Sequence, residues 1–174
     1  MTDSPRNEFW DFSLAFYGDS AVQEACLDIQ DNHGADVNLM LFCLYQASVG
    51  HCLADDTVRH LDAQVAAWRG EVVQPLRAIR RHLKPLPFPL SEDAQTDVRN
   101  DIKRLELRAE MHQQLHLDAL DVGVAAWKPL GEAARINLGV YAGFIGADPD
   151  ASSLAVLLDR FDQLYGARSA DGSD

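Results

Sequence analysis

Lysine is scarce in this chain of 174 residues, which contains three lysines against twelve arginines. Acidic side chains outnumber basic ones 27 to 15, and the formal net charge at pH 7 is −12. A nucleic-acid backbone is bound by clustered positive charge, so this balance argues against nucleic acid as a partner. An acidic, lysine-poor surface suits either a salty environment or the docking of a partner, and the composition leaves both open.

Long apolar runs are also missing. No stretch reaches the roughly 18–20 residues that a transmembrane helix needs. The first ten residues, MTDSPRNEFW, have an early acid and lack the apolar core of a signal peptide. We interpret the three cysteines, Cys26, Cys43 and Cys52, as reduced thiols, because their number is odd. We therefore expect a cytoplasmic protein with no membrane span.

Familiar catalytic motifs are absent as well. The chain has no HExxH or CxxC metal motif, no GxSxG, and no phosphate loop or dinucleotide fingerprint. Cys52 follows His51 directly, but neighbours in sequence rarely face each other productively, and no acid is placed to support the pair. We expect no cofactor and favour a protein without catalysis, although an enzyme is not excluded.

Helical periodicity, by contrast, recurs along almost the whole chain. It predicts helices over residues 5–17, 20–32, 37–49, 56–83, 92–120, 131–145 and 151–165. No strand pattern stands out. We predict an all-α fold, a single-domain bundle of about six or seven helices without a sheet, over residues 1–166. The last residues, 167–174, read as a disordered tail.

The segment HGADVNLMLFCLY, residues 33–45, predicts the centre of this bundle. Gly34 is placed to end one helix in the left-handed conformation, and Asp36 to cap the next. The helix 37–49 is apolar nearly all round, which is typical of a helix that other helices surround. Ser20 and Ser91 are further predicted N-caps, and Ser4 with Pro5 would begin the first helix.

The middle of the chain contains prolines at two places and a long helix with a predicted core face. Pro75 should kink the long helix 56–83 without ending it, because the apolar stripe continues in phase. Alternate prolines in KPLPFPL, residues 84–90, predict an extended strap. In the helix 92–120, Val98, Ile102, Leu105 and Ala109 are expected to line the core face.

Four segments in this order resemble one family: FWDFSLAFY at 9–17, HGADVNLMLFCLY at 33–45, VVQPLRAIRRHLK at 72–84 and LELRAE at 105–110. They are similar to an uncharacterised proteobacterial family of small helical proteins, a domain of unknown function whose members show FWxFSLxxY followed by HGxDVNLLLFCLW. The resemblance covers about residues 9–118. It implies an all-helical fold and a bacterial cytoplasm, and it supplies no reaction, substrate or catalytic residue.

Asn38 is the first candidate for a function, because a buried amide needs hydrogen-bond partners. It shares a side of the helix 37–49 with Tyr45 and Gln46. It could bond loop backbone beside Asp36, lock two helices together, or form the polar floor of a pocket. For the last possibility we predict a ligand site of Asn38, Tyr45, Gln46 and Trp68.

Opposite charges form the second candidate. Residues 77–108 carry a net charge of +3 between acidic flanks of −9 and −6. If the helices on either side of the proline strap pack antiparallel, basic residues on one would meet two glutamates four apart on the other. The predicted cluster is Arg77, Arg80, Arg81, Lys84, Glu106 and Glu110. It could fix the register of the helices or bind an anionic partner or ligand.

His112 and His116 lie four residues apart on one predicted helix, a spacing that lets two histidines share a metal ion. A third ligand would have to come from elsewhere, so we predict no metal site and keep this pair as a weak candidate.

Two functions remain. The first is a non-catalytic interaction or regulatory protein, which an exposed apolar patch near Trp10 or Trp68 would favour. The second is a protein that binds, or acts on, an apolar small molecule beside the helix 37–49.

Overall fold

A computed structural model of the chain describes residues 7–84, 91–148 and 151–166. The fold is all-α, as predicted. The helices are α1 (Glu8–Tyr17), α2 (Ser20–His33), α3 (Val37–Ala47), α4 (Asp55–Trp68), the π-helix η1 (Arg69–Val73), α5 (Gln74–His82), α6 (Glu92–Asp118), α7 (Leu130–Ile145) and α8 (Ser152–Tyr165). Because α4, η1 and α5 follow one another without a break, the described residues form seven separate helical segments. The expected tail at 167–174 lies outside the described residues.

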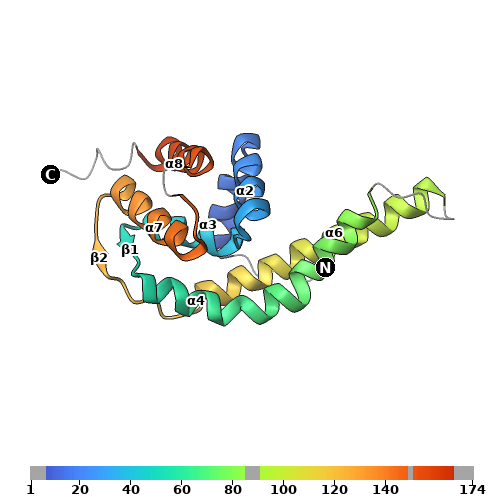
Figure 1. Ribbon diagram of the computed structural model, residues 1–174, viewed down its shortest axis with the longest axis horizontal. Coiled ribbons are helices and arrows are strands. Elements are labelled where there is room, and N and C mark those ends of the chain that lie inside the picture. Colours follow the sequence, from blue (N-terminus) through green and yellow to red (C-terminus); the bar gives the residue numbers. More distant parts are fainter. Residues whose placement is uncertain (1–6, 85–90, 149–150, 167–174) are drawn as a thin grey trace.

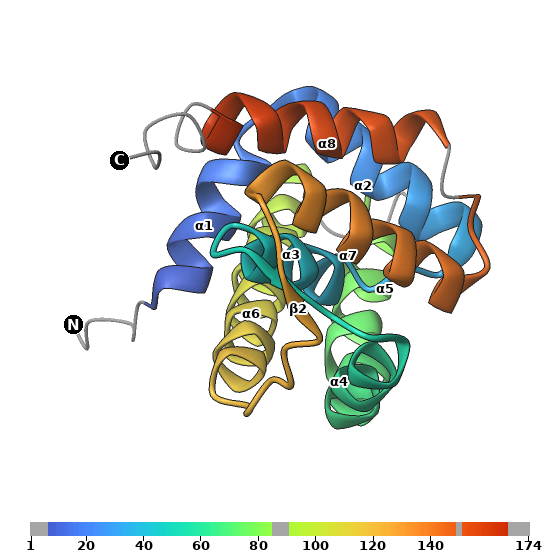
Figure 2. The same ribbon diagram turned by 90° about the vertical axis from the view of Figure 1, so that its left-hand side faces the viewer.

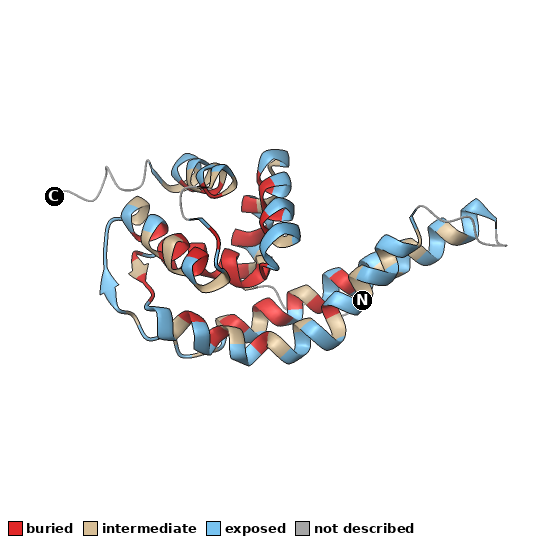
Figure 3. Ribbon diagram, in the orientation of Figure 1, coloured by how far each residue is buried: buried red, intermediate tan, exposed pale blue. Residues whose placement is uncertain are grey.

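The helix α3 lies at the centre, between α6 and α7, as Figure 2 shows from one end of the molecule. Its side chains Leu39, Phe42 and Leu44 are fully buried. Red, buried positions concentrate on α3 and on the surfaces that face it in Figure 3. The apolar run therefore forms the core of the bundle, because an isolated apolar helix could not hide every side.

A glycine and two aspartates cap the two ends of α2 and the start of α3. Gly34 has a φ of 66°, and its N–H donates to Gln30 O at the end of α2. The carboxylate of Asp36 accepts from the N–H groups of Asn38 and Leu39 at the start of α3. The cap of α2 is Asp19 and not Ser20, since the Asp19 carboxylate accepts from two free N–H groups of the first turn.

Helix α1 begins at Glu8, where the Asn7 side chain accepts from the backbone N–H of Trp10. The expected start at Ser4 and Pro5 lies outside the described residues.

The π-helix η1 lies directly before Pro75, the residue at which the sequence predicts a kink. Proline has no N–H to donate to the carbonyl four residues earlier, and its ring would crowd that carbonyl in a regular α-helix. In η1 the chain is wider, and Gln74 N–H donates to Arg69 O, five residues back. The helical segment therefore continues through Pro75, with one π-helical turn in place of a regular α-helical turn before it.

The α4–η1–α5 segment and α6 form a long helical hairpin, whose far end extends beyond the other helices in Figure 1. Ser91 caps α6 as predicted, through a hydrogen bond from Ala94 N–H. Val98 and Leu105 are exposed, so they do not line a core face. Both residues belong to the apolar stripe of α6, but at these positions no other described element covers the stripe. Residues 85–90 of the expected strap lie outside the described residues.

One short ribbon departs from a purely helical chain. The two-residue strands β1 (His51–Cys52) and β2 (Ala126–Trp127) pair antiparallel. Asn137 on α7 is fully buried and holds β1 in place. Its side chain accepts from Leu53 N–H at 2.8 Å and donates to His51 O at 2.9 Å. None of the helices among the described residues is both long and apolar enough to cross a membrane.

Candidate binding groove

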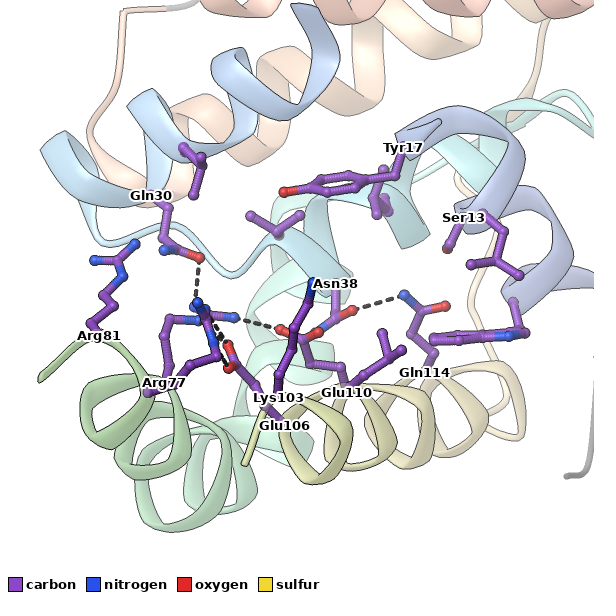
Figure 4. Close-up of a pocket in the computed structure, with 17 residues that line it drawn as sticks. Ser13, Tyr17, Gln30, Asn38, Arg77, Arg81, Lys103, Glu106, Glu110 and Gln114 are labelled. Carbon is purple, nitrogen blue, oxygen red and sulfur yellow. Dashed lines mark hydrogen bonds and ion pairs between the residues drawn. The ribbon is translucent and has the colours of Figure 1, made fainter. Parts of the chain in front are cut away.

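A cavity of about 290 Å³ lies where α1, α2, α3, α5 and α6 meet, and we call it the groove. Figure 4 shows its lining side chains. Apolar walls come from all of these helices except α5, through Trp10, Leu14, Tyr17, Leu27, Val37, Leu41 and Leu107. The polar lining consists of Ser13, Gln30, Asn38, Arg77, Arg80, Arg81, Lys103, Glu106, Glu110 and Gln114.

Helical spacing explains how these side chains converge. On α1 the lining residues recur at spacings of three and four, which places them on one face of the helix. On α6 the series Lys103, Glu106, Glu110 and Gln114 has the same property. Leu14, Leu27 and Leu107 remain exposed, so the apolar walls of the groove are in contact with solvent.

Arginine and glutamate side chains tie α5 to α6 along one side of the groove. Arg77 Nε donates to Glu106 Oε1 at 3.0 Å, and Arg77 Nη2 donates to Glu110 Oε1 at 2.5 Å. Arg77 Nη1 also reaches Gln30 Oε1 on α2 at 2.5 Å. Arg80 bonds both carboxylate oxygens of Glu106. These bonds form an ionic wall along the groove, which fixes the register of α5 on α6.

The two glutamates of this wall differ in pKa. Burial acts to raise the pKa of Glu106, but hydrogen bonds from Arg80 and Arg77 outweigh it, so the pKa lies below its usual value. Burial raises the pKa of Glu110 above its usual value, against the lowering influence of Arg77. Burial also raises the pKa of Tyr17, to about 12. Glu106 is therefore held as a carboxylate, whereas Glu110 takes up a proton more readily.

Amide and hydroxyl groups line the end of the groove beside α1. Asn38 Oδ1 accepts from Gln114 Nε2 at 2.8 Å, which joins α3 to α6. Gln114 Oε1 and Ser13 Oγ are buried and have no hydrogen-bond partner among the described residues. Figure 4 shows Ser13 and Gln114 on one side of the view and Arg81 on the opposite side.

Asp36 organises a buried network next to the groove. Its Oδ2 accepts from Arg69 Nη1 at 2.9 Å and from Gln113 Nε2 at 2.6 Å. Its backbone N–H donates to the Tyr141 hydroxyl at 2.8 Å, and that hydroxyl donates to Asp36 O at 3.0 Å. These bonds hold the start of α3 against η1, α6 and α7, so their role is structural.

The other predicted ligand-site residues do not join Asn38 at the groove. Tyr45 stacks on Phe9, with ring centroids 5.1 Å apart, on the side of α3 that faces α1. Gln46 Oε1 lies 2.8 Å from His51 Nδ1 beside the ribbon. Trp68 Nε1 donates to Ala109 O at 3.0 Å on the hairpin.

The remaining predicted residues lie at the edges. Arg81 lines the groove and forms an ion pair with Asp31 at 3.3 Å, while Lys84 is exposed beyond the end of α5. His112 and His116 are exposed and line a separate depression together with Trp68. No group of three or more histidine, cysteine, aspartate or glutamate side chains among the described residues is arranged to hold a metal ion.

Sequence reasoning missed Ser13, Gln30, Lys103, Leu107 and Gln114. A usable signal existed on α6, because Gln114 follows Glu106 and Glu110 at the next spacing of four. Ser13 and Gln30 carried no such signal, since their position depends on how α1 and α2 pack against α3.

The comparisons with known proteins identify a family and nothing further. No curated protein and no solved structure matches the chain. The model of the family described as "Protein of unknown function (DUF2390)" matches residues 8–117, which include α1 to α5 and almost all of α6. Because the match covers more than half of the chain, the protein belongs to this family of proteins of unknown function.

Proposed function

We propose that this protein is a non-catalytic binding protein that holds a small, largely apolar molecule in the groove. Pockets for small ligands usually have volumes of about 300–1,000 Å³, apolar walls and a few placed polar groups. The groove, at about 290 Å³, lies at the lower limit of this range and has both kinds of lining. A compact ligand therefore fits it better than a large cofactor.

The main support for this proposal comes from two buried oxygen atoms, Ser13 Oγ and Gln114 Oε1, which have no hydrogen-bond partner among the described residues. Buried side-chain oxygens are nearly always hydrogen-bonded, because an unmade bond costs about 1–3 kcal/mol. Gln114 Oε1 and Ser13 Oγ are buried without a partner, and both side chains line the groove. A bound molecule with one hydrogen-bond donor would satisfy Gln114 Oε1 and offset that cost.

The lining groups favour binding over catalysis. A hydroxyl nucleophile needs a base within hydrogen-bond reach, and Ser13 Oγ has no partner among the described residues. Both glutamates are already engaged by Arg77. Tyr17, with a pKa near 12, stays protonated at neutral pH and is a poor base.

We further propose that the protein acts in the cytoplasm and does not bind nucleic acid. The three cysteines are buried free thiols, as expected in a reducing compartment. The net charge of −12 opposes association with a polyanion.

Two leucines of α6 provide a matched test of groove binding. Leu105 is 52% and Leu107 is 50% exposed, but only Leu107 lines the groove. We expect the neutral dye N-phenylnaphthylamine to gain fluorescence with the wild type and with Leu105→Glu, and to lose most of it with Leu107→Glu. Equal fluorescence with both variants, each shown to be folded by circular dichroism, would contradict binding in the groove.

A second candidate function is supported by the exposed apolar side chains of the hairpin. Trp68, Ile79, Val98 and Leu105 are all exposed, and Val98 and Leu105 share one face of α6. The face of α6 with Val98 and Leu105 suits a protein contact, and we take a second copy of the chain as the partner. Sedimentation analysis tests it: a dimer that Val98→Glu splits would support the contact, and a monomer at all concentrations would oppose self-association.

A further inference from the structure

We infer that the molecule bound in the groove is an apolar anion, with a carboxylate or similar group at the end near Lys103 and with its hydrogen-bond donor toward Gln114. This inference rests on the proposed function, because it names the class of ligand for the same groove.

Charge around the groove differs in sign from charge on the whole protein. Its lining contains four basic side chains, Arg77, Arg80, Arg81 and Lys103, and two acidic ones, Glu106 and Glu110. The formal net charge of the complete chain is −12. A positive site on an acidic protein attracts anions locally, while the remaining surface repels them at longer range.

Lys103 is the uncommitted cation of this set. Arg77 and Arg80 are neutralised by Glu106 and Glu110. Arg81 is paired with Asp31, through an exposed contact of 3.3 Å. Lys103 has no hydrogen-bond or ion-pair partner among the described residues, although it lines the groove. An incoming carboxylate can therefore pair with Lys103 without breaking an existing bond, and with Arg81 by displacing a weak one.

The apolar lining adjoins this cation. Leu107 follows Lys103 by one helical turn on α6, so the two side chains are neighbours on the same face. Leu14 and Trp10, which lie on the same face of α1 as Ser13, add to this apolar lining. Arg81 and Gln114 lie at opposite sides of the groove in Figure 4. An apolar chain with a terminal anion thus meets charge at one end and leucine side chains along its length.

The test compares three molecules with the same chain and different end groups: decanoate, decanol and decylamine. We expect displacement of N-phenylnaphthylamine to show that decanoate binds about tenfold more tightly than decanol, and that decylamine binds most weakly. Raising the salt concentration should weaken the binding of decanoate and leave that of decanol unchanged.

Variants at neighbouring positions separate the site from the general charge of the protein. Lys103→Met should weaken decanoate binding about tenfold without changing decanol binding. Arg104→Met removes the same charge from the next residue of α6, which is exposed and does not line the groove, so it should change decanoate binding less than about twofold.

Two results would overturn the inference. One is that decanol or decylamine binds as tightly as decanoate, and the other is that both methionine variants weaken decanoate equally. If the dye still binds in a manner that depends on Leu107, groove binding stands and only the anionic class fails. If the dye does not bind at all, the proposed function fails with it.

Discussion

Glu106 and Glu110 show how one residue type takes two roles within a single turn of α6. Glu106 accepts from both Arg77 and Arg80, and its pKa lies below the usual value despite burial. Glu110 is engaged by Arg77 alone, and burial keeps its pKa above the usual value. The arginine donors outweigh burial at Glu106 but not at Glu110, so Glu106 is the carboxylate that stays ionised more firmly.

This difference predicts opposite pH dependences. A lowered pKa stabilises the fold above the carboxyl's ordinary pKa, and that stabilisation is lost as the pH falls through the folded-state value. Glu106→Gln should therefore lower the free energy of unfolding by about 2 kcal/mol at pH 7, and the deficit should shrink as the medium becomes acidic.

The contribution of Glu110 to stability should change with pH in the opposite direction. Its raised pKa contributes stability at low pH that is lost as the pH rises through the folded-state value, so Glu110→Gln should cost less than Glu106→Gln at pH 7. Urea unfolding of both variants between about pH 3 and about pH 8 measures the two profiles, because this window extends to both sides of the ordinary pKa of a glutamate, about 4.3. A larger loss for Glu110→Gln at neutral pH would contradict this assignment.

A second prediction at this scale concerns the Tyr141 hydroxyl. It accepts from Asp36 N–H and donates to Asp36 O, and the side chain is fully buried. Tyr141→Phe leaves the buried Asp36 N–H without an acceptor, while Asp36 O keeps the Met40 N–H as a donor, and it should cost about 2 kcal/mol in urea unfolding. Tyr45→Phe, whose hydroxyl has no hydrogen bond to a described residue, should cost less than about 0.5 kcal/mol.

At the scale of the element, a glycine inside a helical segment and a glycine just after a helix have opposite requirements. Gly70 lies in η1, where a Cβ would meet no atom within 4 Å. Gly34 ends α2 with a φ of 66°, which side chains adopt reluctantly. Gly70→Ala should therefore raise the free energy of unfolding by about 0.5–1 kcal/mol, and Gly34→Ala should lower it by about 1 kcal/mol. Thermal unfolding of both variants measures the pair, and the same sign of change in both would contradict the assigned conformations.

The elements that the sequence predicts well are those that depend on nearby residues. Gly34, Asp36 and Ser91 act within one helical turn of their own positions, so local chemistry identifies them. Periodicity also locates the helices, but it cannot tell which apolar face is covered. Val98 and Leu105 repeat like core residues, yet the hairpin extends past the bundle and leaves them exposed.

The candidate site was predictable only in part for the same reason. Arg77 and Glu106 lie on helices adjacent in sequence, so their meeting follows from an antiparallel hairpin. Asn38 and Tyr45 share a side of α3 on a helical wheel, but two turns separate them, and each meets a different neighbour. Asn38 faces Gln114 of α6, whereas Tyr45 packs against α1.

At the scale of the whole molecule, the groove is an intersection of five helices that no single segment of sequence describes. Its apolar lining comes mostly from α1, α2 and α3, and its charged lining comes mostly from α5 and α6. The family match includes α1 to α5 and nearly all of α6, so every helix of the groove lies within it. The groove therefore lies within the part of the chain that the family model matches.

The three tryptophans report on three different surfaces, which allows binding to be located in one measurement. Trp10 lines the groove, Trp68 lies on the hairpin, and Trp127 is exposed on β2. In a titration of ¹⁵N-labelled protein with decanoate, followed by two-dimensional NMR, we expect the indole N–H signal of Trp10 to shift. The signals of Trp68 and Trp127 should stay in place. Movement of either of these two signals while Trp10 stays unchanged would contradict binding in the groove.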